Sequence, residues 1–139
     1  MSNHSFQLRL LCSYAEPDNS IADLKVDVLV DDRWEQFDLN IQTAGFLMLV
    51  YTIFTCQHMY MRTNCAEKGL MLDSANGTID LLADEDWVVQ SMYISFVGKL
   101  RSGSPDMEAV AYIKERMNEC PVSKNLTRIP DIRTEVYFV

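Results

Sequence analysis

The sequence has few of the residues on which most binding and catalytic sites are built. It contains two histidines and four cysteines in 139 residues, too few for most metal sites and zinc-finger frameworks. Twenty Asp and Glu residues outnumber twelve Lys and Arg residues, and the net charge is −8. Because nucleic acids and anionic membranes attract basic surfaces, this balance argues against either as the main partner. We therefore expect no bound metal, no nucleic acid and no membrane.

Long hydrophobic runs and targeting signals are also missing. The longest apolar run, residues 44–56, has thirteen residues and includes two threonines. A membrane span needs about 20 residues, so the run predicts a buried helix of a globular protein. The first seven residues have neither the basic nor the apolar region of a signal peptide. We therefore expect a cytoplasmic protein whose cysteines are reduced unless they take part in catalysis or redox sensing.

The remaining pattern predicts one α+β domain over residues 1–139. Apolar residues make up 48% of the chain and charged residues 23%, as in an ordinary globular protein. Apolar or alternating stretches predict strands at residues 6–14, 24–30, 33–41, 76–82, 87–100 and 131–139. Helical patterns follow at residues 44–68 and 105–119, with a short helical turn at 121–126. The element order is therefore β-β-β-α-β-β-α-α-β, without the regular strand and helix alternation of a parallel α/β protein.

The helix at residues 44–68 is the main predicted structural element. Thr43 is a suitable N-cap, and Lys68-Gly69 is a typical helix end. Residues 44–54 are apolar on all sides, which predicts that the first half is enclosed and that the second half emerges toward solvent. Likewise, Ser104 and Pro105 predict the cap and first residue of the second helix.

The four cysteines differ in their predicted surroundings. Cys12 lies in an apolar strand, and Cys65 faces the opposite side of the long helix from Cys56, so both are interpreted as packing residues. On residue type alone, Cys56 is also interpreted more readily as a small buried hydrophobic residue than as a functional cysteine. Cys120 precedes a proline and is predicted to N-cap the turn at residues 121–126, where backbone amides favour a thiolate. A plain helix junction is an equally good interpretation of Cys120.

The segment Glu-Cys-Pro-Val-Ser-Lys-Asn-Leu at residues 119–126 resembles the second cysteine motif of the OsmC/Ohr family of thiol peroxidases. Cys56 resembles the family's first cysteine, because it lies on a long apolar helix that ends in a Lys-Gly pair before a strand. The two cysteines are 64 positions apart, which is also similar to the family spacing.

The resemblance implies an intertwined homodimer with long central helices packed between sheets of both subunits. It implies that Cys56 is the peroxidatic cysteine, which attacks an organic hydroperoxide, and that Cys120 resolves the resulting sulfenic acid as a disulfide. A dithiol would then reduce that disulfide, and neither a metal nor an organic cofactor is required.

The sequence departs from the family pattern where the first cysteine is activated. The family has a glutamate about ten residues before this cysteine, where Phe46 stands here. It also has an arginine from the N-terminal region, for which Arg33 and Arg9 are candidates and Lys25 is a weaker one. Loss of this activation would lower the thiolate fraction by about 30-fold at neutral pH. Along the helix, the hydroxyl groups of Thr52 and Tyr60 are close enough to support a thiolate.

A second hypothesis follows from the same departure. The chain could be a catalytically reduced relative that keeps the fold as a dimeric binding protein for a small apolar ligand. The residues expected to line such a pocket are Phe46, Met48, Phe54 and Met59, although such a set at helical spacing more often forms ordinary core.

Overall fold

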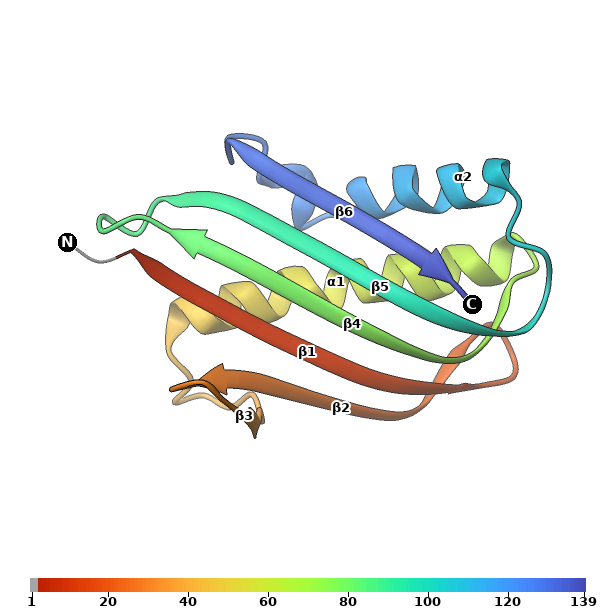
Figure 1. The fold of residues 1–139 in the computed structure, drawn as a ribbon, viewed down its shortest axis with the longest axis horizontal. Coiled ribbons are helices and arrows are strands. Elements are labelled where there is room, and N and C mark those ends of the chain that lie inside the picture. Colours follow the sequence, from red (N-terminus) through yellow and green to blue (C-terminus); the bar gives the residue numbers. More distant parts are fainter. Residues whose placement is uncertain (1–2) are drawn as a thin grey trace.

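A computed structural model describes residues 3–139 as one mixed sheet with two helices on one of its faces (Figure 1). The strand order is β3-β2-β1-β4-β5-β6, and all neighbouring pairs are antiparallel except β5 and β6. The elements are, in chain order, β1 (His4–Ala15), β2 (Ser20–Val30), β3 (Arg33–Gln36), α1 (Gly45–Glu67), β4 (Met71–Ala83), β5 (Val89–Ser102), α2 (Met107–Asn118), the 3₁₀ turn η1 (Ser123–Asn125) and β6 (Asp131–Phe138). The α+β class and the predicted order of elements are confirmed.

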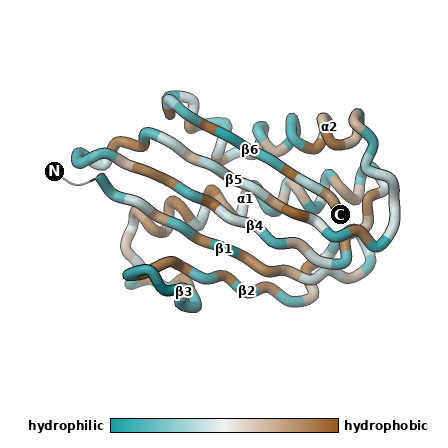
Figure 2. The backbone as a smooth tube through the Cα atoms, in the orientation of Figure 1, coloured by the Kyte–Doolittle hydropathy of each residue, from teal (hydrophilic) through white to brown (hydrophobic). Residues whose placement is uncertain are grey.

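The core lies between the sheet and α1. Alternate residues of β1 are buried, from Leu8 to Tyr14, and they face buried α1 residues such as Ile53 and Phe54. Figure 2 shows the corresponding hydrophobic segments along the central strands. No helix of residues 3–139 is long and apolar enough to cross a membrane.

The end of α1 is as predicted, but its start is not. Gly69 has a φ of +75°, and the amide of Leu70 donates to the carbonyl of Cys65 at 2.8 Å, which closes the helix with a left-handed glycine. Ala44 occupies the N-cap position without a side-chain hydrogen bond. The Thr43 prediction is therefore wrong, because its hydroxyl oxygen accepts from the Asn40 amide in the preceding turn instead.

The second half of α1 does not emerge toward solvent as predicted, and the first half is enclosed only in part. The residues from Phe46 to Leu49 are only half-buried, whereas Gln57, Met61 and Cys65 in the second half are fully buried. The reason is that α2 packs beside the second half, where the Gln57 amide donates to the Met117 carbonyl at 2.9 Å. Within the single chain a sheet covers one side of α1 only, and the second sheet implied by the resemblance would come from the other subunit of a dimer.

Smaller differences concern the edge strand and the later helices. The hairpin turn at Asp31 and Asp32 is confirmed, with φ of 49° and 63°, but β3 is shorter than predicted and fully exposed. The N-cap of α2 is Asp106, whose carboxylate accepts from the Ala109 amide at 2.8 Å, so the Ser104 prediction is wrong. The predicted short helix is reduced to the 3₁₀ turn η1.

Candidate thiol site

The fold brings Cys56 and Cys120 together. Cys56 lies near the middle of α1 and is partly exposed, and Cys120 follows α2 and is fully buried. Both are free thiols. The packing of α2 and η1 against α1 places the Cys120 side chain where it interacts with the Cys56 thiol. Two sulfur atoms that are 64 positions apart in the sequence are therefore neighbours in space.

The surroundings of Cys56 favour its protonated form within the single chain. Burial raises the pKa of the Cys56 thiol above its ordinary value, and the nearby Cys120 side chain raises it further. The backbone N–H of Val122 offsets part of this rise. Within residues 3–139, the groups that shift this pKa include no positive charge. Activation of Cys56 as a nucleophile therefore needs a further group.

Cys120 is held by two hydrogen-bond donors. Its sulfur accepts from the Ser123 amide at 3.3 Å and from Gln57 Nε2 at 3.6 Å. The N-cap of η1 is Val122, so the predicted cap position of Cys120 is wrong, although its sulfur still accepts from the amide three residues later, as a cap side chain does. Gln57 Nε2 also donates to the Met117 carbonyl at 2.9 Å and to Ser123 Oγ at 2.7 Å, so the glutamine ties α1, α2 and η1 together.

The structure does not bring the other predicted supporting residues to the thiols. The Thr52 hydroxyl donates to the Met48 carbonyl of its own helix at 2.8 Å. Tyr60 is half-buried with the Arg116 guanidinium 5.9 Å from its ring centre. Arg33 is exposed at the start of β3, and it forms no ion pair with another residue of the range 3–139.

Phe46 belongs to an aromatic cluster instead of a thiol-activating pair. Its ring centre lies 5.0 Å from that of Phe6 and 5.1 Å from that of Trp87. The first turn of α1 contains no acidic residue, as the sequence indicated. The four residues expected to line an apolar pocket do not share a wall, because Phe54 is buried in a stack with Phe96 while Met59 is half exposed.

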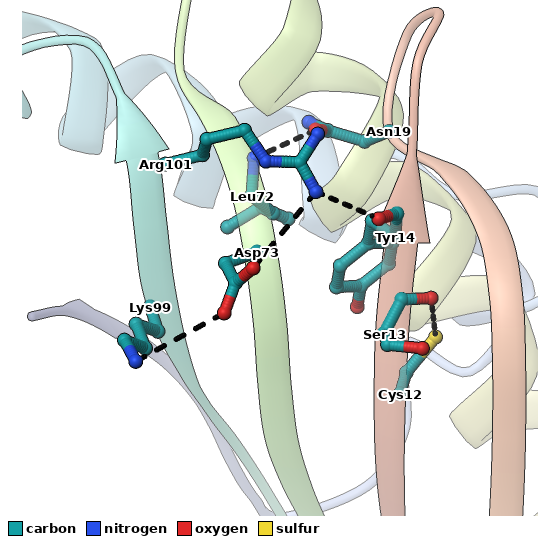
Figure 3. A network of polar contacts seen from close by, with 8 residues as sticks. All are labelled: Cys12, Ser13, Tyr14, Asn19, Leu72, Asp73, Lys99 and Arg101. Carbon is teal, nitrogen blue, oxygen red and sulfur yellow. Dashed lines mark hydrogen bonds and ion pairs between the residues drawn. The ribbon is translucent and has the colours of Figure 1, made fainter.

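The other cysteines and the helical histidine belong to the core. Cys12 and Cys65 are buried, as predicted, and burial raises the pKa of both thiols. His58 is hydrogen-bonded to the Tyr14 hydroxyl at 2.6 Å and points away from the thiol pair. At the end of β1 that contains Tyr14, Arg101 of β5 donates to the Tyr14 carbonyl at 3.0 Å (Figure 3). Residues 3–139 contain no group of three or more His, Cys, Asp or Glu side chains that could hold a metal ion.

Gln57 and Ser123 are the site residues that the sequence analysis missed. Ser123 could have been identified, because the residue three positions after an N-cap donates its amide to the cap side chain. Gln57 has no such signal. Its contacts depend on how α2 crosses α1, which no local pattern encodes.

Comparisons with solved structures identify the fold. An OsmC-like protein from Mycoplasma pneumoniae has a TM-score of 0.55 at 11% identity, over 93% of this chain and 95% of that one. An OsmC-like hydroperoxide resistance protein from Jannaschia sp. CCS1 has a TM-score of 0.58 at 12% identity, over 89% and 87%. A hypothetical protein from Aquifex aeolicus VF5 has a TM-score of 0.60 at 10% identity, over 83% and 87%. No protein-family model and no curated protein matches the sequence. The chain therefore has the OsmC-like fold, as the resemblance predicted.

Proposed function

We propose that this protein is a thiol-dependent peroxidase that reduces organic hydroperoxides through Cys56 and Cys120. The observation that carries the proposal is the proximity of these two free thiols, one on α1 and one after α2. The fold supports it, because an OsmC-like protein with the same architecture is described as a hydroperoxide resistance protein.

The reaction requires two steps at the thiol pair. The Cys56 thiolate attacks the terminal peroxide oxygen, the O–O bond breaks, and the alkoxide takes a proton to leave as an alcohol while Cys56 becomes a sulfenic acid. Cys120 then attacks the sulfenic sulfur, which releases water and forms the Cys56–Cys120 disulfide. A dithiol returns both residues to thiols and is itself oxidised to a disulfide, as expected in a reducing cytoplasm.

A homodimer would provide the activation that the single chain lacks. Cys56 borders a side of α1 on which Thr52, Thr55 and Met59 are exposed and on which no sheet packs. In an intertwined dimer, the second subunit would cover this side and bring a cation to Cys56. Arg33 is the candidate for this cation, because it is free of ion pairs within the described chain.

Mass spectrometry after treatment with one equivalent of cumene hydroperoxide tests the proposal. We expect one intramolecular disulfide, a loss of about 2 Da. Cys56→Ser should abolish peroxide consumption, whereas Cys120→Ser should still react and accumulate the sulfenic acid. Cys12→Ala is the matched control and should behave like the unmodified protein, since Cys12 is buried away from the pair. Two thiols left free after peroxide treatment would contradict the proposal.

The raised pKa of Cys56 and the aromatic cluster at Phe46 favour a second candidate, a dimeric binding protein without peroxidase activity. The two candidates differ in one measurement made on the dimer. A peroxidase requires an alkylation midpoint of Cys56 well below pH 8, whereas a binding protein keeps the raised value. Light scattering would establish the dimer first, through a mass of twice 16.0 kDa.

A further inference from the structure

A cavity of about 590 Å³ lies next to Gln57, where α2, η1, β5 and β6 meet. Its volume is within the range of small-molecule binding sites. Buried side chains form its floor and charged side chains its rim, which is the arrangement of a pocket open to solvent. The floor residues are Gln57, Met92 and Thr134.

Gln57 provides an unsatisfied acceptor at this floor. Its Nε2 donates to the carbonyl of Met117 and to the hydroxyl of Ser123. Its Oε1 is buried and has no hydrogen-bond partner within residues 3–139. Exchange of the two amide atoms would place Oε1 against the Met117 carbonyl oxygen, a repulsive contact, so the orientation is determined by the chain itself. Gln57 is fully buried, and an unpaired acceptor there is unfavourable unless a bound group donates to it.

Thr134 provides a second unpaired group at the same floor. The residue is 9% exposed, and its hydroxyl has no partner among the described residues. A hydroxyl can donate and accept, whereas Gln57 Oε1 only accepts. A ligand hydroxyl or amino group can therefore donate to Gln57, and a ligand hydroxyl can also accept from Thr134.

The charged residues at the rim favour a negatively charged ligand. The cavity lining contains three cations, Lys114, Lys124 and Arg133, but one carboxylate, Glu135, although the whole chain carries −8. Lys114 pairs with Glu135 at 3.0 Å, while Lys124 forms no ion pair with any residue of the range 3–139. Lys124 is therefore the cation available to an anionic ligand.

We propose that this cavity binds a small organic carboxylate that also carries a hydroxyl or amino group. The donor group reaches the floor between Gln57 and Thr134, and the carboxylate meets Lys124 at the rim. The apolar walls formed by Leu126 and Ile132 accommodate the carbon chain between the two ends. The site is separate from the peroxide reaction, so it holds or fails whether or not Cys56 is a peroxidatic cysteine.

Three matched probes test the two ends of the ligand by protein-observed NMR titration. 6-Hydroxyhexanoate has both groups, hexanoate lacks the donor, and 1,6-hexanediol lacks the charge. We expect 6-hydroxyhexanoate to bind about tenfold more tightly than either of the other two, since each lacks one charge-assisted or buried hydrogen bond. Equal binding of hexanoate and 6-hydroxyhexanoate would overturn the floor assignment, and absence of shifts with all three at about 10 mM would overturn the site.

Two variants assign the contacts. Thr134→Val keeps the shape of the side chain but removes its hydroxyl, so it should weaken the binding of 6-hydroxyhexanoate but not that of hexanoate. Lys124 is exposed, so Lys124→Gln should leave the fold intact, and it should weaken the binding of both carboxylates but not that of the diol. Lys99→Gln is the matched control, because Lys99 is exposed on β5, faces Asp73 and does not line the cavity (Figure 3). Unchanged binding in Thr134→Val and in Lys124→Gln would refute the proposal.

Discussion

His58 should make the stability of this protein depend on pH between neutral and acidic conditions. The residue is 2% exposed, its ring stacks on Phe96 at 5.8 Å, and it is hydrogen-bonded to the Tyr14 hydroxyl at 2.6 Å. Burial, with a smaller contribution from the nearby Arg62 charge, lowers the pKa of His58 from 6.5 to about 4. The folded protein therefore keeps His58 neutral under conditions where the unfolded chain protonates it.

The direction and size of the effect follow from proton linkage. Between pH 6.5 and pH 4 the unfolded chain binds more protons at His58 than the folded protein, so the free energy of unfolding falls as the pH falls. From pH 7 to pH 4.5 the loss amounts to about 2 kcal/mol, since each pKa unit corresponds to about 1.4 kcal/mol and most of the shift is traversed.

Urea denaturation at pH 7 and pH 4.5 measures this loss. The double variant His58→Phe/Tyr14→Phe removes both partners of the buried hydrogen bond and should lose about 2 kcal/mol of the pH dependence. Tyr14→Phe alone is the matched control, because it keeps a buried histidine and should keep the dependence. Carboxylates that titrate in the same range contribute equally to each protein and cancel in the difference. A double variant as pH-sensitive as the unmodified protein would refute the role of His58.

Three further predictions concern the core, a helix end and the thiol. Gly77→Ala should lower the free energy of unfolding in urea by about 1–3 kcal/mol, because the new Cβ would lie 2.5 Å from the Phe96 ring. Gly45→Ala is the control and should not lower it, because no atom lies within 4 Å of the new Cβ. Asp106→Ala should cost about 1 kcal/mol in thermal unfolding, since it removes the N-cap acceptor of α2. In protein diluted to the monomer, alkylation of Cys56 should be slow at pH 7 and should rise with pH without levelling off at the ordinary pKa of a cysteine thiol, because burial raises the pKa of Cys56; rapid reaction at pH 7 would contradict this.

Elements with strong local signals could be predicted from the sequence. The end of α1 depends on Gly69, where a left-handed conformation favours glycine, and the β2–β3 turn depends on two residues that tolerate positive φ. Alternating burial in β1 follows directly from alternating apolar residues. The cysteine pair was predicted through the resemblance of its spacing and of the motif around Cys120 to the OsmC/Ohr family, whereas the predicted cap position of Cys120 is taken by Val122.

Features that depend on packing between distant segments could not be predicted. The first half of α1 is as apolar as a buried helix, yet α2 covers the second half, so composition alone misjudged which half is enclosed. The Ser104-Pro105 pair predicted the start of α2, but the backbone enters the helix two residues later, where Asp106 is the cap. Gln57 has no local signal at all, because its partners lie about 60 positions away.

This glutamine connects the thiol pair with the cavity. Its amide nitrogen faces Met117, Ser123 and the Cys120 sulfur, and its oxygen is the unpaired acceptor of the cavity floor. A donor bound to Oε1 polarises the amide and strengthens the N–H contacts at its other end. Occupancy of the cavity and the contact between Gln57 and the Cys120 sulfur would then favour each other by the same coupling free energy in both directions. Because hydrogen bonds to sulfur are weak, we expect the coupling to be small and to disappear in Gln57→Met.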